Sequence, residues 1–99
     1  MNKQLKFTAK VWLYDGPAGW HFVTVPVDLS SKIKASNFGS QKAFGSVAIV
    51  ATIGNTSWKT SVFPDSKAGA YLLPIKAAVR RKEKIQIGAE VQVALEVVT

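Results

Sequence analysis

The stretch Ser46–Pro64, SVAIVATIGNTSWKTSVFP, carries the clearest structural signal in the chain. In its first half, every second side chain from Val47 onward belongs to one face of a strand, and every second side chain from Ala48 onward belongs to the other face. Both faces are apolar enough for a strand that is buried on both sides. The Gly54-Asn55 pair then separates this strand from a second one, and such a two-residue connection is typical of a tight β-hairpin. The segment therefore predicts two neighbouring antiparallel strands.

The N-terminal part of the chain predicts a second hairpin. Residues 5–14, LKFTAKVWLY, alternate apolar and polar side chains, which indicates a strand with one buried face. The turn residues DGPAG follow at 15–19, and WHFVTVPV at 20–27 forms the returning strand, which Pro26 should end. The face of the first strand that we expect to be buried contains Leu5, Phe7, Ala9, Val11 and Leu13.

Two short helices are expected between the strands. Residues 28–36, DLSSKIKAS, have apolar side chains at the four-residue spacing of one helix face. A polar, glycine-containing loop follows at 37–45. Pro74 suits the first turn of a second helix over residues 75–82, IKAAVRRK, in which Val79 should face the core.

The last two strands are predicted at residues 70–75, AYLLPI, and 88–99, GAEVQVALEVVT. The chain then contains six strands and two short helices, which is an all-β fold. So many strands in so short a chain favour a closed or nearly closed β-barrel, because closure removes the exposed edges of an open sheet. A sandwich of two packed sheets is the alternative.

The composition indicates one domain over residues 1–99. Hydrophobic side chains make up 47% of the 99 residues, enough for a single core without disulfides. The N-terminus lacks the apolar stretch and cleavage site of a signal peptide, and the longest apolar run, around residues 47–53, is far shorter than the ~20 residues of a membrane-spanning helix. A cytoplasmic location is therefore expected.

The charge and the rare residue types narrow the chemistry. A formal net charge of +7 favours an anionic ligand or nucleic acid as partner, and the alternative is that the lysines serve solubility and protect strand edges. The absence of cysteine and the presence of a single histidine make a transition-metal site improbable. No phosphate-binding loop occurs, and no cofactor or metal is expected.

Three segments in fixed order resemble a known family. They are FTAKVWLYDGPAGWHFVTVP, GSVAIVATIGNTSWKTSVFP and YLLPIKAAVRRKEKIQIGAEVQV. Together they resemble the bacterial domain-of-unknown-function 1905 (DUF1905) family over essentially the whole chain. The resemblance implies a small closed Greek-key β-barrel of about six strands, and it implies no established biochemical activity.

Aromatic residues from three predicted strands are candidates for one ligand pocket. Trp20, Trp58 and Tyr71, with Phe22 and Phe63, would suit a base or an anionic aromatic ligand by stacking. The alternative is that these rings fill the barrel interior. We expect Phe22 and Phe63 to be core residues, and we leave the exposure of the two tryptophans open.

Two groups of residues in the sequence could serve an enzyme. His21 is a lone acid-base group without an evident partner. Lys59 lies two residues from Ser57 and from Ser61 on one strand face, as a serine-lysine dyad would require, but no nucleophile elbow accompanies it. An enzyme is therefore the least favoured interpretation.

The segment VRRKEK, residues 79–84, concentrates positive charge on the predicted second helix, where Lys76 and Arg80 share a face. These charges either bind an anion or are the solvated side of a connector. We expect a non-enzymatic ligand- or partner-binding domain; the alternatives are a nucleic-acid binder that uses the Lys76–Lys84 segment and a hydrolase that uses Ser61, Lys59 or His21. The candidate ligand-binding residues are Trp20, His21, Trp58, Lys59, Ser61, Tyr71, Lys76, Arg80 and Arg81.

Overall fold

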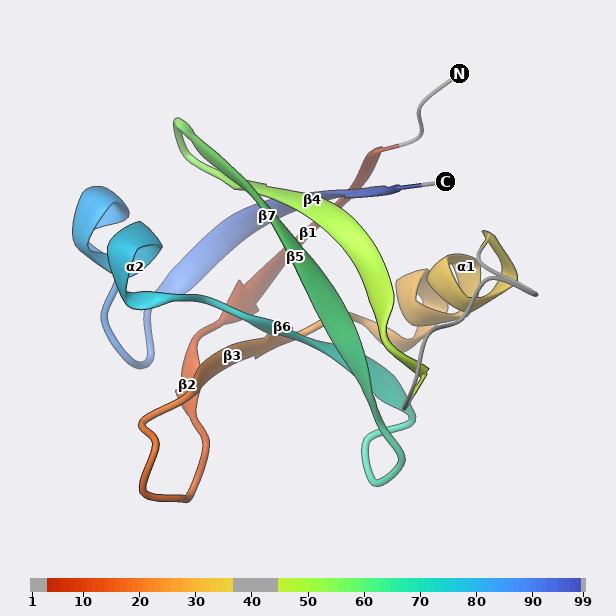
Figure 1. The fold of residues 1–99 in the computed structure, drawn as a ribbon, viewed down its shortest axis with the longest axis horizontal. Helices are drawn as coiled ribbons and strands as arrows, with labels where there is room; N and C mark the ends of the chain where they lie inside the picture. The colour runs from red at the N-terminus through yellow and green to blue at the C-terminus, as the bar shows by residue number, and fades with distance from the viewer. Residues whose placement is uncertain (1–3, 37–44, 99) are drawn as a thin grey trace.

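The computed structural model describes residues 4–36 and 45–98, and in them seven strands form one antiparallel sheet that curves into a half-barrel (Figure 1). The expected all-β class is confirmed. The sheet is a single one, so the sandwich alternative is wrong. The strands are β1 (Gln4–Lys10), β2 (Trp12–Leu13), β3 (His21–Thr24), β4 (Val47–Ile53), β5 (Thr56–Asp65), β6 (Ala70–Pro74) and β7 (Glu90–Val97).

The barrel is open, and the prediction of a closed six-stranded barrel is wrong. The strand order is β1-β7-β4-β5-β6-β3-β2, so β1 and β2 are the two ends of the sheet. They follow one another in the chain but are separated by Val11, which is bonded outside the strand ladder. The Val11 N–H donates to the carbonyl of Ala89 at 3.0 Å, and the Val11 carbonyl accepts from the N–H of Gly88 at 2.7 Å. The single strand predicted there is consequently split in two.

The face of the first strand that was predicted to be buried is confirmed over most of its length. Leu5, Phe7 and Ala9 pack against the core and Val11 is buried, as the alternation predicted. Leu13, expected on the same face, is 46% exposed and lies opposite His21 at the end of β2.

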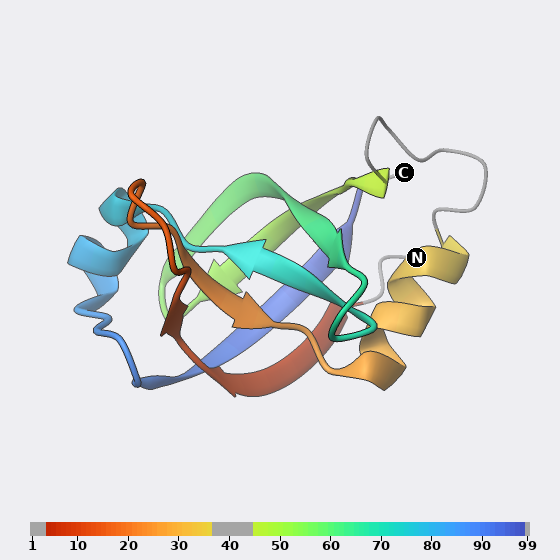
Figure 2. The same cartoon turned by 90° about the horizontal axis from the view of Figure 1, so that it is seen from below.

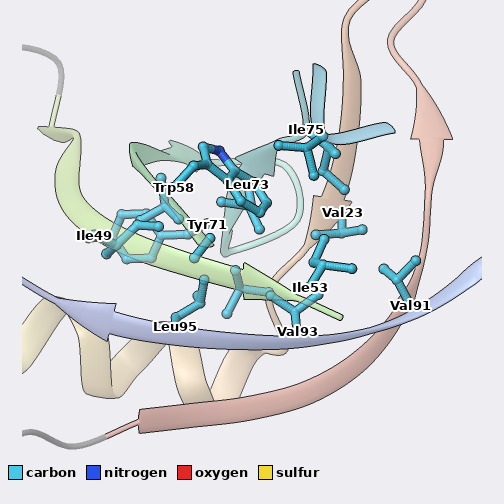
Figure 3. Close-up of a cluster of buried hydrophobic side chains, with 14 of the residues drawn as sticks. Val23, Ile49, Ile53, Trp58, Tyr71, Leu73, Ile75, Val91, Val93 and Leu95 are labelled. Atoms are coloured by element: carbon cyan, nitrogen blue, oxygen red, sulfur yellow. The ribbon is translucent and has the colours of Figure 1, made fainter. Parts of the chain in front are cut away.

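The central hairpin is confirmed. β4 and β5 pair from Val47 opposite Val62 to Ile53 opposite Thr56, and Gly54 adopts a left-handed φ of 59° in the turn. β4 is fully buried on one face and half-buried on the other. Figure 3 shows the core that these strands enclose, with labelled side chains from β3, β4, β5, β6 and β7 converging on one interior.

The two helices, α1 (Val27–Ser36) and α2 (Ala77–Glu83), lie at opposite ends of the half-barrel (Figures 1 and 2). Both were predicted, but Pro74 ends β6 opposite Phe22 instead of starting α2, since residues 75 and 76 remain extended. The predicted loop at 37–45 lies outside the described residues except for Gly45. Among the described residues, no helix has the length and apolar character needed to cross a membrane.

Candidate functional site

A hollow of about 540 Å³ lies between α2 and the beginning of β5. Its cationic side chains come from α2 and from the residue before it, and its hydroxyl groups come from β5. We call it the basic groove. It is lined by Thr56, Ser57, Trp58, Lys76, Ala78, Val79, Arg81 and Lys82.

The apolar residues of α2 fix the position of the groove's charges. Val79 and Ile75 are each 2% exposed and belong to the main core cluster. The helix ends at Lys84, whose left-handed φ of 55° turns the chain back toward the core, and the N–H of Ile85 then donates to the carbonyl of Arg80 at 2.9 Å. Because one face of α2 is anchored in this way, Arg81 and Lys82 are held on its outer side.

The one acidic side chain of α2 does not neutralise the groove. Thr56 donates its hydroxyl hydrogen to Glu83 Oε2 at 2.6 Å, which turns the carboxylate toward the β4–β5 turn. A Cβ atom at Gly54 would displace this carboxylate from its present position, and the left-handed φ of Gly54 favours glycine there. Within the described part of the chain, Lys76, Arg81 and Lys82 have no ion-pair partner, and three cations against the one Glu83 carboxylate leave the groove with a net positive charge.

Arg80 and His21, both predicted ligand-binding residues, contact each other instead of the groove. Arg80 donates from Nε to the carbonyl of Ile75 at 3.2 Å and from a terminal nitrogen to His21 Nε2 at 3.3 Å. His21 Nδ1 lies 2.8 Å from the carbonyl of Gly19. A guanidinium only donates and a carbonyl only accepts, so these two contacts require the neutral imidazole with its proton on Nδ1. The pair fastens the β2–β3 connection to α2.

A second hollow, of about 280 Å³, is lined by four aromatic side chains: Tyr14, Trp20, Phe22 and Phe63. We call it the aromatic hollow. The Trp20 and Phe22 rings stack with an interplanar angle of 9° and centroids 6.0 Å apart, and Tyr14 meets Phe22 edge-on. Trp20, Tyr14 and Phe63 are 53%, 51% and 42% exposed. Large rings are rarely left so accessible unless they have a partner.

The outward face of β5 joins the two hollows. Ser57, Lys59, Ser61 and Phe63 alternate with the inward Trp58 and Val62 along this strand. Ser57 lines the basic groove and Phe63 lines the aromatic hollow. Lys59 and Ser61, two of the predicted ligand-binding residues, consequently lie between them.

The predicted residues thus form more than one group. Trp58, Lys76 and Arg81 line the basic groove, although Trp58 is only 8% exposed and contributes little more than an edge. Trp20 lies in the aromatic hollow. Tyr71 is a core residue near α1, where burial raises the pKa of its phenol above the ordinary value. Lys76 lines the basic groove, whereas Arg80, expected on the same face, is bonded to Ile75 and His21.

The sequence prediction misplaced two aromatic residues and missed a third. Phe63 was expected in the core but is exposed, and Phe22 is half-buried. The strand alternation contained the signal for Phe63, because its neighbour Val62 is fully buried and successive side chains of a strand point to opposite faces. Tyr14 was not a candidate, although the alternation that places Leu13 on the inward face places Tyr14 on the outward one.

Among residues 4–36 and 45–98, no three His, Cys, Asp or Glu side chains lie close enough together to hold a metal ion. Lys59 has no hydrogen bond to Ser57 or Ser61 in the described structure, and the Ser57 hydroxyl is instead 2.7 Å from that of Thr52. No curated protein matches the chain. A family described as "Domain of unknown function (DUF1905)" matches residues 7–95, nearly the whole sequence, and the protein therefore belongs to the DUF1905 family.

Proposed function

We propose that this protein is a non-enzymatic binding module and that its ligand is anionic and occupies the basic groove. The observation that carries the proposal is the convergence of Lys76, Arg81 and Lys82 on one hollow while the nearby acid, Glu83, is bonded to Thr56. Uncompensated cations around a concave surface raise the local concentration of anions. Ser57 lines the same hollow, and its hydroxyl can donate to a phosphate or carboxylate oxygen when it accepts from Thr52.

Anion binding need not explain every lysine of this basic chain. Lys6 and Lys10 are exposed on β1, an end strand of the open sheet, where charged side chains discourage pairing with another molecule. The groove cations are not on an end strand. They belong to a short helix that is anchored by Val79 beside a central strand, so edge protection does not account for them.

The hydrolase alternative has less support. A serine nucleophile needs a base within hydrogen-bonding reach, and the described structure has no such contact for Ser61. Both ring nitrogens of His21 are engaged, one with Gly19 and the other with Arg80.

The proposal is tested with inorganic polyphosphate as probe, titrated at several salt concentrations by calorimetry. We expect binding that weakens steeply with salt, because each neutralised charge releases a counterion. Replacing two of the three groove cations, Arg81→Ala with Lys82→Ala, should reduce the slope of log K against log salt by about 2, one for each lost contact.

A matched control removes the same charge elsewhere. Lys10→Ala with Lys34→Ala changes the net charge equally but affects β1 and α1, away from the groove. Its slope should equal that of the unmodified protein. An equal reduction of the salt slope in both double variants would mean that the overall charge, rather than the groove, binds the anion. The absence of polyphosphate binding at low salt would overturn the proposal.

A further inference from the structure

We infer that the anionic ligand is a single-stranded nucleic acid, which runs along the outward face of β5 with phosphates in the basic groove and bases stacked in the aromatic hollow. This inference rests on the proposed function and names its ligand class. The argument depends on the chemistry of the aromatic hollow, on its connection to the groove and on the distribution of charge.

The aromatic hollow exposes aromatic side chains to solvent. Trp20 lies parallel to Phe22, and Tyr14 and Phe63 complete an almost entirely apolar surface. A flat π-face of this kind binds any nucleobase by stacking, without regard to sequence. Bases in a duplex are already stacked on one another, so a ligand must be single-stranded to use these rings.

The two hollows are separated by a distance that suits a polymer. Ser57 and Phe63 are six residues apart on the same strand face, which corresponds to about 20 Å of strand at about 3.3 Å per residue. A small anion fills only the groove and a small aromatic molecule fills only the hollow. Lys59 lies on the face between them and has no partner among the described residues, so it is available to a phosphate on the way.

The relative position of the rings and the cations is fixed in the folded protein. Arg80 joins α2 to His21, and Trp20 is the residue between Gly19 and His21, which are themselves linked through the imidazole. Figures 1 and 2 show the β2–β3 connection and α2 at the same end of the molecule in both views. A ligand that spans both hollows therefore loses little affinity to ordering of the protein.

Charge favours nucleic acid over a protein partner as the occupant. The outward face of β5 between Ser57 and Phe63 contains a lysine and no acidic residue, and the chain as a whole has a net charge of +7. Nucleic acid offers a continuous row of negative charge together with flat bases. A protein partner of ordinary composition offers both signs of charge to this surface.

The test compares three probes of equal length by fluorescence anisotropy at low salt: a single-stranded oligodeoxynucleotide, the same strand with abasic sugars, and the corresponding duplex. We expect the single strand to bind more tightly than the abasic strand and the duplex. Trp20→Ala or Phe63→Ala should weaken single-strand binding at least about fivefold, as expected for one lost base stack, and leave abasic-strand binding unchanged.

A matched control keeps the hairpin but changes its other face. Leu13→Ala removes an exposed apolar side chain that lies opposite His21, outside the aromatic hollow, and should not affect binding. Circular dichroism of each variant checks that the fold is retained.

The outcomes separate the two proposals. If polyphosphate and the abasic strand bind as well as the single strand, and Trp20→Ala has no effect, the inference is overturned while the anion-binding function stands. Preference for the duplex overturns the inference as well. If neither the single strand nor polyphosphate binds, both proposals fail. Self-association that Trp20→Ala abolishes, without base-dependent binding, assigns the hollow to a second copy of the chain and overturns the inference.

Discussion

The two ends of the half-barrel differ in whether the polar side chains of their helices have hydrogen-bond partners. At the α1 end, Ser30 is 4% exposed and its hydroxyl donates to the carbonyl of Val25 at 3.2 Å and accepts from the N–H of Tyr71 at 3.0 Å. At the α2 end, Lys76, Arg81 and Lys82 have no protein partner within the described residues. Both helices are short and bury one apolar face, so the difference lies in their polar side chains. The α1 end contains a buried, bonded hydroxyl, whereas the α2 end has three cations without a protein partner among the described residues.

The largest expected effect on stability comes from a substitution in the buried face of α1. Ile33 is fully buried in the core cluster, and Ile33→Ala removes most of its side chain and leaves a cavity. We expect a loss of about 2–5 kcal/mol in the free energy of unfolding, measured by urea denaturation. Polyphosphate binding by the folded fraction should not change. A change in the salt slope would show that the two ends are coupled.

Removing the buried hydroxyl of α1 comes next. Ser30→Ala leaves the Tyr71 N–H and the Val25 carbonyl without this partner, which should cost about 1–3 kcal/mol of stability. Ser31→Ala is the matched control, because Ser31 is exposed and its hydroxyl bonds only within the helix, to the carbonyl of Val27. The control should stay within about 0.5 kcal/mol of the unmodified protein. Similar losses in both variants would contradict a structural role for Ser30.

The α2 end allows a comparison between a bonded and an unbonded cation. Arg80→Lys retains the charge but cannot reproduce two donors in the fixed geometry that reaches Ile75 and His21. We expect stability to fall by about 1 kcal/mol, and the emission of exposed Trp20 to change, since the hairpin is released from the helix. Arg81→Lys should leave both unchanged. A shift in the salt slope of Arg80→Lys would contradict the assignment of this arginine to structure.

The smallest effect concerns alkaline pH. Burial raises the pKa of Tyr71 in the folded protein, whereas in the unfolded chain its phenol ionises near 10.0. Its contribution to stability is therefore complete below about pH 10 and is lost as the pH rises through the folded pKa, because the unfolded state releases its proton first. Tyr71→Phe should lose less stability than the unmodified protein above about pH 10. Identical pH profiles in denaturant titrations would contradict this.

Much of the fold followed from local patterns. The Gly54-Asn55 turn, both helices and the two strands of the central hairpin were predicted correctly, because each depends on a repeat of two or four residues or on one turn. The open barrel was not predicted. It follows from the strand order, in which β1 pairs only with β7 and β2 only with β3, and Val11 between them bonds to Ala89 and Gly88 just before β7. No pattern near residue 11 indicates a contact so distant in the sequence.

The candidate site followed the same division. The sequence showed that cations cluster between residues 76 and 84 and that aromatic residues surround the first turn. It did not show that Arg80 is bonded to His21, which lies 59 residues away, or that Phe63 faces outward toward Trp20. Those facts require knowledge of how distant strands and helices meet.

The sequence by itself determined an all-β domain of the DUF1905 family with an excess of positive charge. Family motifs, periodicity and composition can be recognised without knowing which distant residues are in contact. Only the tertiary structure decided which cations remain available and which aromatic rings reach solvent. Both outcomes depend on the long-range pairing of β5 with β6 and of β6 with β3, together with the packing of α2 beside β5. These contacts join residues far apart in the chain, and no local preference encodes them.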